Sequence, residues 1–169
     1  MSKQKYPLFS VFGIELEYMI TDKNLNALPI ADQLIQHFTG TIDSHFESHD
    51  VGISNELALH VIEIKTRDPI PALDTFAQSF HREVLALNSV LEHKFGAQLM
   101  PTGAHPWLDP ARGIELWPHH NRDIYTAFDR IFDCKGHGWG NLQSTHINLP
   151  FADDHEFFLF EKKTFFALI

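Results

Sequence analysis

The sequence predicts an α+β fold, and two stretches dominate that prediction. Residues 8 to 20 alternate in character from one position to the next, as expected for a strand with one buried face. Residues 71 to 95 have helical periodicity and end before Gly96, a typical residue to follow a helix. The apolar stripe of that helix, which we expect to lie on a sheet, contains Leu73, Phe76, Ala77, Phe80, Val84, Leu87 and Leu91.

The remaining elements follow from shorter patterns. We expect further strands over residues 57 to 66, 97 to 102 and 141 to 149. We expect further helices over residues 30 to 38 and 123 to 132, and a last helix that opens at Asp153 or Asp154. Residues 41 to 55 are polar and fit a short strand and a loop. Residues 135 to 140, punctuated by glycine, should form a flexible loop or a tight turn.

Length and charge narrow the class of protein. The 169 residues suit a single domain, and 13 Lys and Arg against 22 Asp and Glu give a formal charge of -9. This charge argues against nucleic acid or an anionic membrane as a default partner. We find no apolar run of membrane-spanning length and no signal-peptide pattern, so we expect a cytosolic protein. Cys134 stands alone, which excludes an internal disulfide.

The most informative feature is a pair of glutamates inside the first predicted strand. Glu15 and Glu17 are two positions apart, so both side chains project from the same face, opposite Ile14 and Leu16. Two adjacent carboxylates on a half-buried sheet repel each other and lose hydration, which favours a cation between them, most simply a divalent metal. The alternative is a solvated strand face without a bound ion.

Further carboxylates occur around the second predicted strand. Glu63 lies between Ile62 and Ile64, and a carboxylate in so apolar a strand usually has a specific partner. That partner is either a metal or a cation such as Lys65. Glu56 is seven positions earlier and has the opposite strand parity, so it reaches the same face only across a bulge or from outside the regular strand.

His146 and Asn148 share one face of the strand predicted over residues 141 to 149. An ordinary polar contact between strands is the alternative to a ligand role. Several carboxylates with one histidine favour Mg²⁺ or Mn²⁺ over zinc, because hard oxygen donors dominate. Such ions commonly serve phosphoryl transfer from ATP, and hydrolysis by a metal-activated water is the competing use.

The order of these motifs resembles the glutamate-cysteine ligase family, and most closely its second type. The motifs are Gly13-Ile14-Glu15-Leu16-Glu17, then Glu56 through Glu63 with Thr66 and Pro69, Gly103-Ala104-His105-Pro106, and His146-Ile147-Asn148. These enzymes are ATP-dependent carboxylate-amine ligases of the glutamine-synthetase-like superfamily. The resemblance implies an antiparallel sheet with helices packed on one face, as part of a glutamine-synthetase-like catalytic domain, with two or three Mg²⁺ ions on the concave face of the sheet.

The resemblance also assigns roles to residues. It implies metal ligands at Glu15, Glu17, Glu56, Glu63 and His146, and substrate- or nucleotide-binding positions at Asn148, His105 and Thr66, while the catalytic residues stay unassigned. The implied reaction joins a small carboxylate, typically the γ-carboxylate of glutamate, to an amine through an acyl phosphate formed from ATP. Glutathione synthesis is one of several options for the product.

The chain departs from the family in length, because members are roughly twice as long and their second half supplies a further glutamate ligand and basic residues. We therefore interpret residues 1 to 169 as the N-terminal half of a larger catalytic domain, a part of an oligomeric site, or a degenerate relative. We expect weak metal and nucleotide binding and poor turnover by the chain alone. The phenylalanine-rich last helix should need a cover, which the missing C-terminal half or a second copy in a homo-oligomer would provide. A metal-dependent hydrolase and a non-catalytic binding module remain alternatives.

Overall fold

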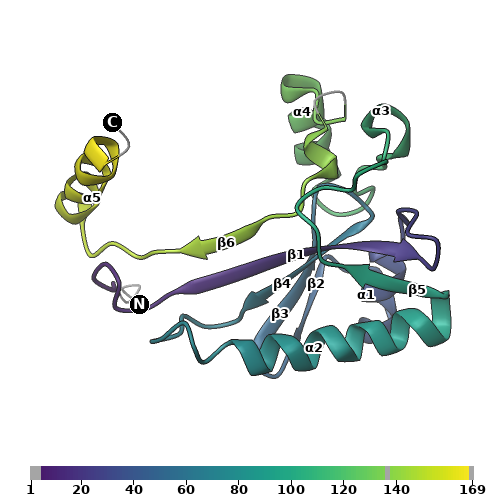
Figure 1. Ribbon diagram of the computed structural model, residues 1–169, viewed down its shortest axis with the longest axis horizontal. Helices are drawn as coiled ribbons and strands as arrows, with labels where there is room; N and C mark the ends of the chain where they lie inside the picture. Colours follow the sequence, from purple (N-terminus) through teal and green to yellow (C-terminus); the bar gives the residue numbers. More distant parts are fainter. Residues whose placement is uncertain (1–4, 136–137, 168–169) are drawn as a thin grey trace.

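Six strands form one antiparallel sheet in the computed structural model, which describes residues 5–135 and 138–167 (Figure 1). The strand order is β2-β3-β4-β1-β5, and β6 also pairs with β1. Every pairing between these strands is antiparallel. The strands are β1 (Gly13–Asp22), β2 (His45–Ser48), β3 (Val51–Asn55), β4 (Val61–Thr66), β5 (Ala97–Met100) and β6 (Thr145–Asn148). The α+β class predicted from the sequence is confirmed.

Helices lie on both sides of the sheet. The helical segments are α1 (Ala31–Thr39), α2 (Ala77–Val90), which continues into a π-helical turn η1 (Leu91–Phe95), α3 (Pro110–Gly113), α4 (Arg122–Phe132), a short 3-10 turn η2 (Trp139–Asn141) and α5 (Asp154–Ala167). The helices α1 and α2 cover one face, while α3 and α4 lie beyond the other (Figure 1). In the described part of the chain, no helix is both long and apolar enough to cross a membrane.

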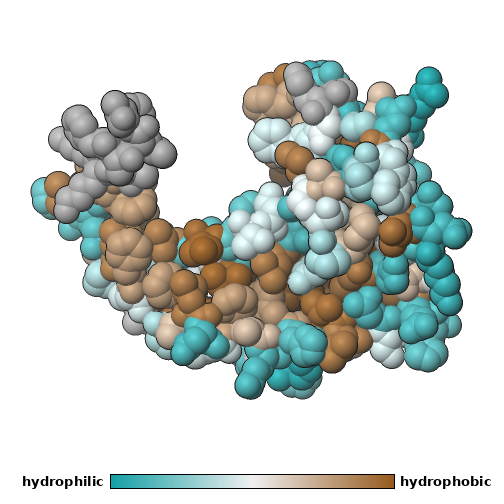
Figure 2. Space-filling model, in the orientation of Figure 1, coloured by the Kyte–Doolittle hydropathy of each residue, from teal (hydrophilic) through white to brown (hydrophobic). Residues whose placement is uncertain are grey.

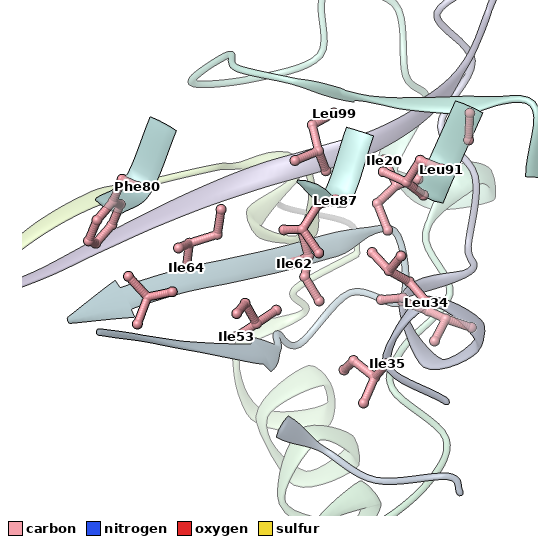
Figure 3. Packing of buried hydrophobic residues seen from close by; sticks show 14 of the residues in the cluster. Ile20, Leu34, Ile35, Ile53, Ile62, Ile64, Phe80, Leu87, Leu91 and Leu99 are labelled. Atoms are coloured by element: carbon pink, nitrogen blue, oxygen red, sulfur yellow. The ribbon is translucent and has the colours of Figure 1, made fainter. Parts of the chain in front are cut away.

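The core forms between the sheet and the helices α1 and α2. Figure 3 shows Phe80 and Leu87 facing Ile64 and Ile62 of the sheet, and Leu91 beside Ile20. On β1, Ile14 and Ile20 are buried in the same cluster, and Leu16 and Tyr18 pack against it. The alternation seen in the sequence therefore places the apolar face of β1 in the core, and Glu15 and Glu17 on the opposite face.

Three predicted strands begin later than their patterns suggest, including the one expected from residue 141, which begins at Thr145. The first was expected from residue 8 and begins at Gly13, because Ser10 turns the chain back onto the Pro7 carbonyl through its backbone N–H (3.1 Å) and its hydroxyl (2.6 Å). The second was expected from residue 57 and begins at Val61. The N–H of Leu59 donates to the Glu115 carbonyl (2.8 Å), so this backbone bonds outside the sheet.

The helix expected from residue 71 begins at Ala77 instead. The Thr75 hydroxyl donates to the Ala72 carbonyl (2.8 Å) and closes a turn ahead of the helix. Residues 41 to 55, interpreted as a short strand and a loop, contain the β2–β3 hairpin. The helix α1 ends as predicted at Gly40, which has φ of 77° and donates its N–H to the Gln36 carbonyl.

The strands β5 and β6 share one edge of β1. The first half of β1, from Gly13 to Leu16, pairs with β6, and its second half, from Met19 to Asp22, pairs with β5. Beyond β6 the chain continues into α5, whose first turn is capped by the Asp153 carboxylate accepting from the Glu156 N–H (2.9 Å).

The C-terminal helix projects away from the sheet and bounds the large notch in the upper outline of the molecule (Figure 2). Phe157, Phe158 and Leu159 on α5 are exposed, as predicted for an apolar helix that needs a cover. Other parts of the sequence predictions concern Gly136, His137, Leu168 and Ile169, which lie outside the described residues.

Candidate metal centre

The register of the sheet brings the predicted ligands together in two rows on the face opposite α2. In the first row, Ser54 on β3, Glu63 on β4 and Glu17 on β1 are direct neighbours across the strands. In the second row, Lys65 on β4 lies opposite Glu15, which lies opposite His146 on β6. Directly opposed side chains in an antiparallel sheet are close enough to interact. The carboxylates of Glu17 and Glu63 therefore face each other without an intervening residue.

Glu56 joins the first row from the connection between β3 and β4. It follows the last residue of β3 and precedes Val61, the first residue of β4. The sequence predicted that Glu56 could reach the face of Glu63 either across a bulge or from outside the regular strand. The structure shows the second arrangement, because Glu56 lies outside the regular strand.

The four glutamates line one pocket of about 290 Å³, together with Ser144, His146 and the loop residues Trp139 and Gly140. Two sets of three ligand atoms lie within 4.8 Å of one another, namely Glu15, Glu63 and His146, and Glu17, Glu56 and Glu63. Glu63 belongs to both sets and its side chain is buried, whereas His146 is exposed. This arrangement fits two divalent cations that share one carboxylate, with oxygen donors in the majority.

Glu15 is oriented by His146 and Asn148, the two residues predicted to share one face of the last strand. Its carboxylate is 3.0 Å from His146 Nδ1 and accepts a hydrogen bond of 2.8 Å from Asn148 Nδ2. Gly13, the register partner of Asn148, makes room for this contact, because a Cβ at Gly13 would lie 3.2 Å from the Asn148 Cβ. Asn148 thus orients the Glu15 carboxylate, a predicted metal ligand, from the neighbouring row of cross-strand residues.

Glu63 is held by Lys65 and Ser54. Its Oε1 accepts from Lys65 Nζ at 2.6 Å and from the Ser54 hydroxyl at 2.8 Å, and Lys65 also donates to Ser54 at 3.0 Å. The ion pair considered as an alternative from the sequence is therefore present. It neutralises only part of the site: among the described residues, Lys65 is the one lysine or arginine paired with any of the four glutamates.

Burial and mutual repulsion act on the carboxyls of Glu56 and Glu17, neither of which is paired with a lysine or an arginine in the described part of the chain. Burial raises the pKa of Glu56 from its ordinary value of 4.5 to about 7, and the negative charges of Glu63 and Glu17 add to the rise. Burial also raises the pKa of Glu17, although a hydrogen bond from the Ser144 N–H (2.8 Å) acts in the opposite direction. Each group is thus destabilised in its charged form, which is the condition that a bound divalent cation would relieve.

The structure places two other predicted site residues outside this pocket. His105 is buried, with Nε2 on the Leu25 carbonyl and its backbone bonded to the Asn141 side chain. The Thr66 hydroxyl accepts from the Ile14 N–H at 3.1 Å and so ties β4 to β1. Both residues hold together the strands and loops that surround the carboxylates.

Sequence reasoning missed several residues around the pocket. Ser54 was hidden in a segment without clear periodicity, and it could have been found only from the β3–β4 register. Ser144 acts through its backbone, which no side-chain pattern reveals. Trp139 lines the pocket from the short turn η2, in the glycine-punctuated segment that was interpreted as a flexible loop or a tight turn.

Comparison with known proteins leaves the chain without an assigned family. No protein-family model matches it. It is similar to a protein of Archaeoglobus fulgidus described only as uncharacterized, with 36% identity over 146 residues. The match covers 86% of this chain and 39% of the archaeal protein, so the chain spans well under half of that relative's length.

Proposed function

We propose that this chain forms the metal-binding part of an ATP- and Mg²⁺-dependent carboxylate-amine ligase of the glutamate-cysteine ligase type. The observation that supports this proposal best is the pair of ligand sets that share Glu63. Phosphoryl transfer needs cations that offset the repulsion between nucleotide phosphates and an attacking anion, and paired sites at one buried carboxylate meet that need. The antiparallel sheet with its acidic face is compatible with a glutamine-synthetase-like domain, which is part of the same proposal.

The proposed ligands are those predicted from the sequence. Glu15, Glu63 and His146 would hold one Mg²⁺ or Mn²⁺, and Glu17, Glu56 and Glu63 would hold the other. The bound ions would supply charge neutralisation between ATP and the carboxylate substrate. In the reaction, a carboxylate oxygen attacks the γ-phosphorus and ADP leaves. An amine then attacks the acyl carbon of the acyl phosphate, phosphate leaves, and the amine loses a proton as the amide forms.

The protein's own contribution is to position the charged groups before the substrates arrive. His146 and Asn148 fix the Glu15 carboxylate, and Ser54 and Lys65 fix Glu63. The Ser144 N–H fixes Glu17 from the backbone. Carboxylates held in this way need little reorganisation when a cation binds, and such preorganisation is the main source of catalysis in this class of reaction.

Titration with Mn²⁺ tests the metal site directly. We expect calorimetry and electron paramagnetic resonance to detect two bound ions per chain, and Glu63→Gln to weaken both at least tenfold because Glu63 is shared. Glu92→Gln removes the same charge from an exposed position on η1 and should bind Mn²⁺ as the parent chain does. Unaltered binding by Glu63→Gln would rule out the shared site.

Product analysis separates a ligase from the alternative hydrolase. With Mg²⁺ and ATP, a ligase releases ADP only when both a carboxylate and an amine are present, and hydroxylamine should trap the acyl phosphate as a hydroxamate. Phosphate release that depends on neither substrate would favour the hydrolase.

A further inference from the structure

A second hollow adjoins the acidic pocket and has a different chemical character. Its volume is about 380 Å³, and Glu56, Leu57 and Trp139 line both hollows. The rest of its wall comes from Tyr125, Phe128 and Phe132 of α4 and from Cys134, which follows that helix. The volume lies in the range of small-molecule sites in proteins.

The aromatic rings of this hollow remain open to solvent. Phe128 is 44% exposed, Phe132 is 54% exposed and Trp139 is 63% exposed. The two phenylalanines lie one helical turn apart on α4, with ring centroids separated by 6.1 Å. Several large aromatic rings gathered at one exposed concave surface are typical of a binding site, whereas single exposed apolar residues are ordinary.

Charge in this hollow is confined to one wall. Of the described residues that line it, Glu56 is the only acid, and none is a lysine or an arginine. Tyr125 and Cys134 add no charge near neutral pH, because burial raises the pKa of the phenol and of the thiol. The Tyr125 hydroxyl is further engaged by Asn55 Nδ2 at 3.1 Å. The hollow is therefore aromatic on one side and anionic at the side where it meets the proposed metal centre.

We propose that this hollow binds an amine with an apolar, preferably aromatic, substituent. The substituent lies among Phe128, Phe132 and Trp139, and the ammonium group lies against the Glu56 carboxylate. A carboxylate ligand is disfavoured here, because Glu56 and the neighbouring Glu17 and Glu63 repel it. If the proposed ligase function holds, this ligand is the acceptor amine, and its nitrogen lies at the wall shared with the carboxylate cluster.

Binding of 2-phenylethylamine at pH 8, in metal-free buffer with a chelator, tests this inference apart from catalysis. Titration calorimetry should give an affinity at least tenfold higher than for ethylamine, which lacks the ring, and than for 3-phenylpropionate, which has the opposite charge. Equal affinity for 3-phenylpropionate, or binding of ethylamine as tight as that of 2-phenylethylamine, would overturn the proposal.

Variants locate the binding. Phe128→Ala should weaken 2-phenylethylamine at least fivefold, and Ile131→Ala on the same helix should not, because Ile131 is 64% exposed and does not line the hollow. Trp139→Ala provides a second test in another segment of the chain. Since α4 has no buried residues, Phe128→Ala is expected to fold. An unchanged affinity in both Phe128→Ala and Trp139→Ala would contradict the proposed location.

The outcome is separable from that of the metal titration. If Mn²⁺ binds at two sites and 2-phenylethylamine does not bind, the amine proposal fails and the ligase proposal stands. If 2-phenylethylamine binds with the expected variant pattern and Mn²⁺ does not bind, the hollow is an amine site and the ligase proposal fails.

Discussion

Replacing Glu56 with glutamine should stabilise the metal-free protein. The pKa of Glu56 rises from its ordinary value of 4.5 to about 7 in the folded chain, chiefly through burial. Because the folded state holds this proton more tightly, folding loses stability as the pH rises from about 4.5 to 7, and the loss is complete above 7. At about 1.4 kcal/mol per pH unit, the rise corresponds to a penalty of about 3 kcal/mol. A glutamine at this position is neutral at every pH and therefore does not carry this penalty in folding stability.

Urea unfolding of the parent chain and of Glu56→Gln, each at pH 5 and pH 8 in the presence of a chelator, measures this effect. We expect the variant to exceed the parent in free energy of unfolding by about 2 to 3 kcal/mol at pH 8, and by much less at pH 5. Added Mn²⁺ should reverse the order at pH 8, since only the parent keeps the full ligand set. A variant that is less stable than the parent at pH 8 without metal would refute the reasoning.

Two further perturbations test neighbouring parts of the structure. Gly13→Ala should weaken Mn²⁺ binding several-fold in a calorimetric titration. The added Cβ would lie 3.2 Å from the Asn148 Cβ and displace the Asn148 amide that holds Glu15. Gly103→Ala is the control, because the space around a Cβ at Gly103 is open. Burial lowers the pKa of His60 from 6.5 to about 4, so His60 should reduce stability by about 3 kcal/mol as the pH falls from about 6.5 to 4, opposite in sign to the contribution of Glu56. Urea unfolding at pH 4.5 and 7 is therefore measured in Glu56→Gln, which lacks the opposing contribution. Adding His60→Gln should abolish most of the remaining pH dependence, and a double variant that keeps it in full would assign it to other groups.

Local alternation predicted the part of the site that lies on regular strands. Period-two patterns placed Glu15 and Glu17 on one face of the first strand, and His146 and Asn148 on one face of another strand. The register of the sheet then puts Glu15 directly opposite His146. Such patterns are reliable because the alternate residues of the same strand, such as Ile14 and Ile20, are apolar and must be buried in the core. Their burial fixes which face the polar residues occupy.

What the sequence left open depends on contacts between distant segments. The position of Glu56 follows from a connection whose backbone bonds to residues near Glu115, which no local pattern indicates. Ser54 matters only because β3 pairs with β4 in one particular register. The aromatic hollow is assembled from α4 and from the segment that follows it. In the sequence, the aromatic side chains of α4 fit the pattern of an ordinary amphipathic helix, so nothing there indicates a binding site.

The shared edge of β1 has a consequence for the order in which the site forms. The strand β6 is held to the sheet by β1 alone within the described chain, over four residues whose side chains are all exposed. It should therefore open at a lower free energy than the central strands, and it brings His146 and Asn148 with it. An ion that binds Glu15, Glu63 and His146 would then hold β6 against the sheet. Part of its binding free energy would offset the cost of docking β6. Metal loading would then further stabilise the docked strand, visible as increased amide protection of residues 145–148 when Mn²⁺ is added.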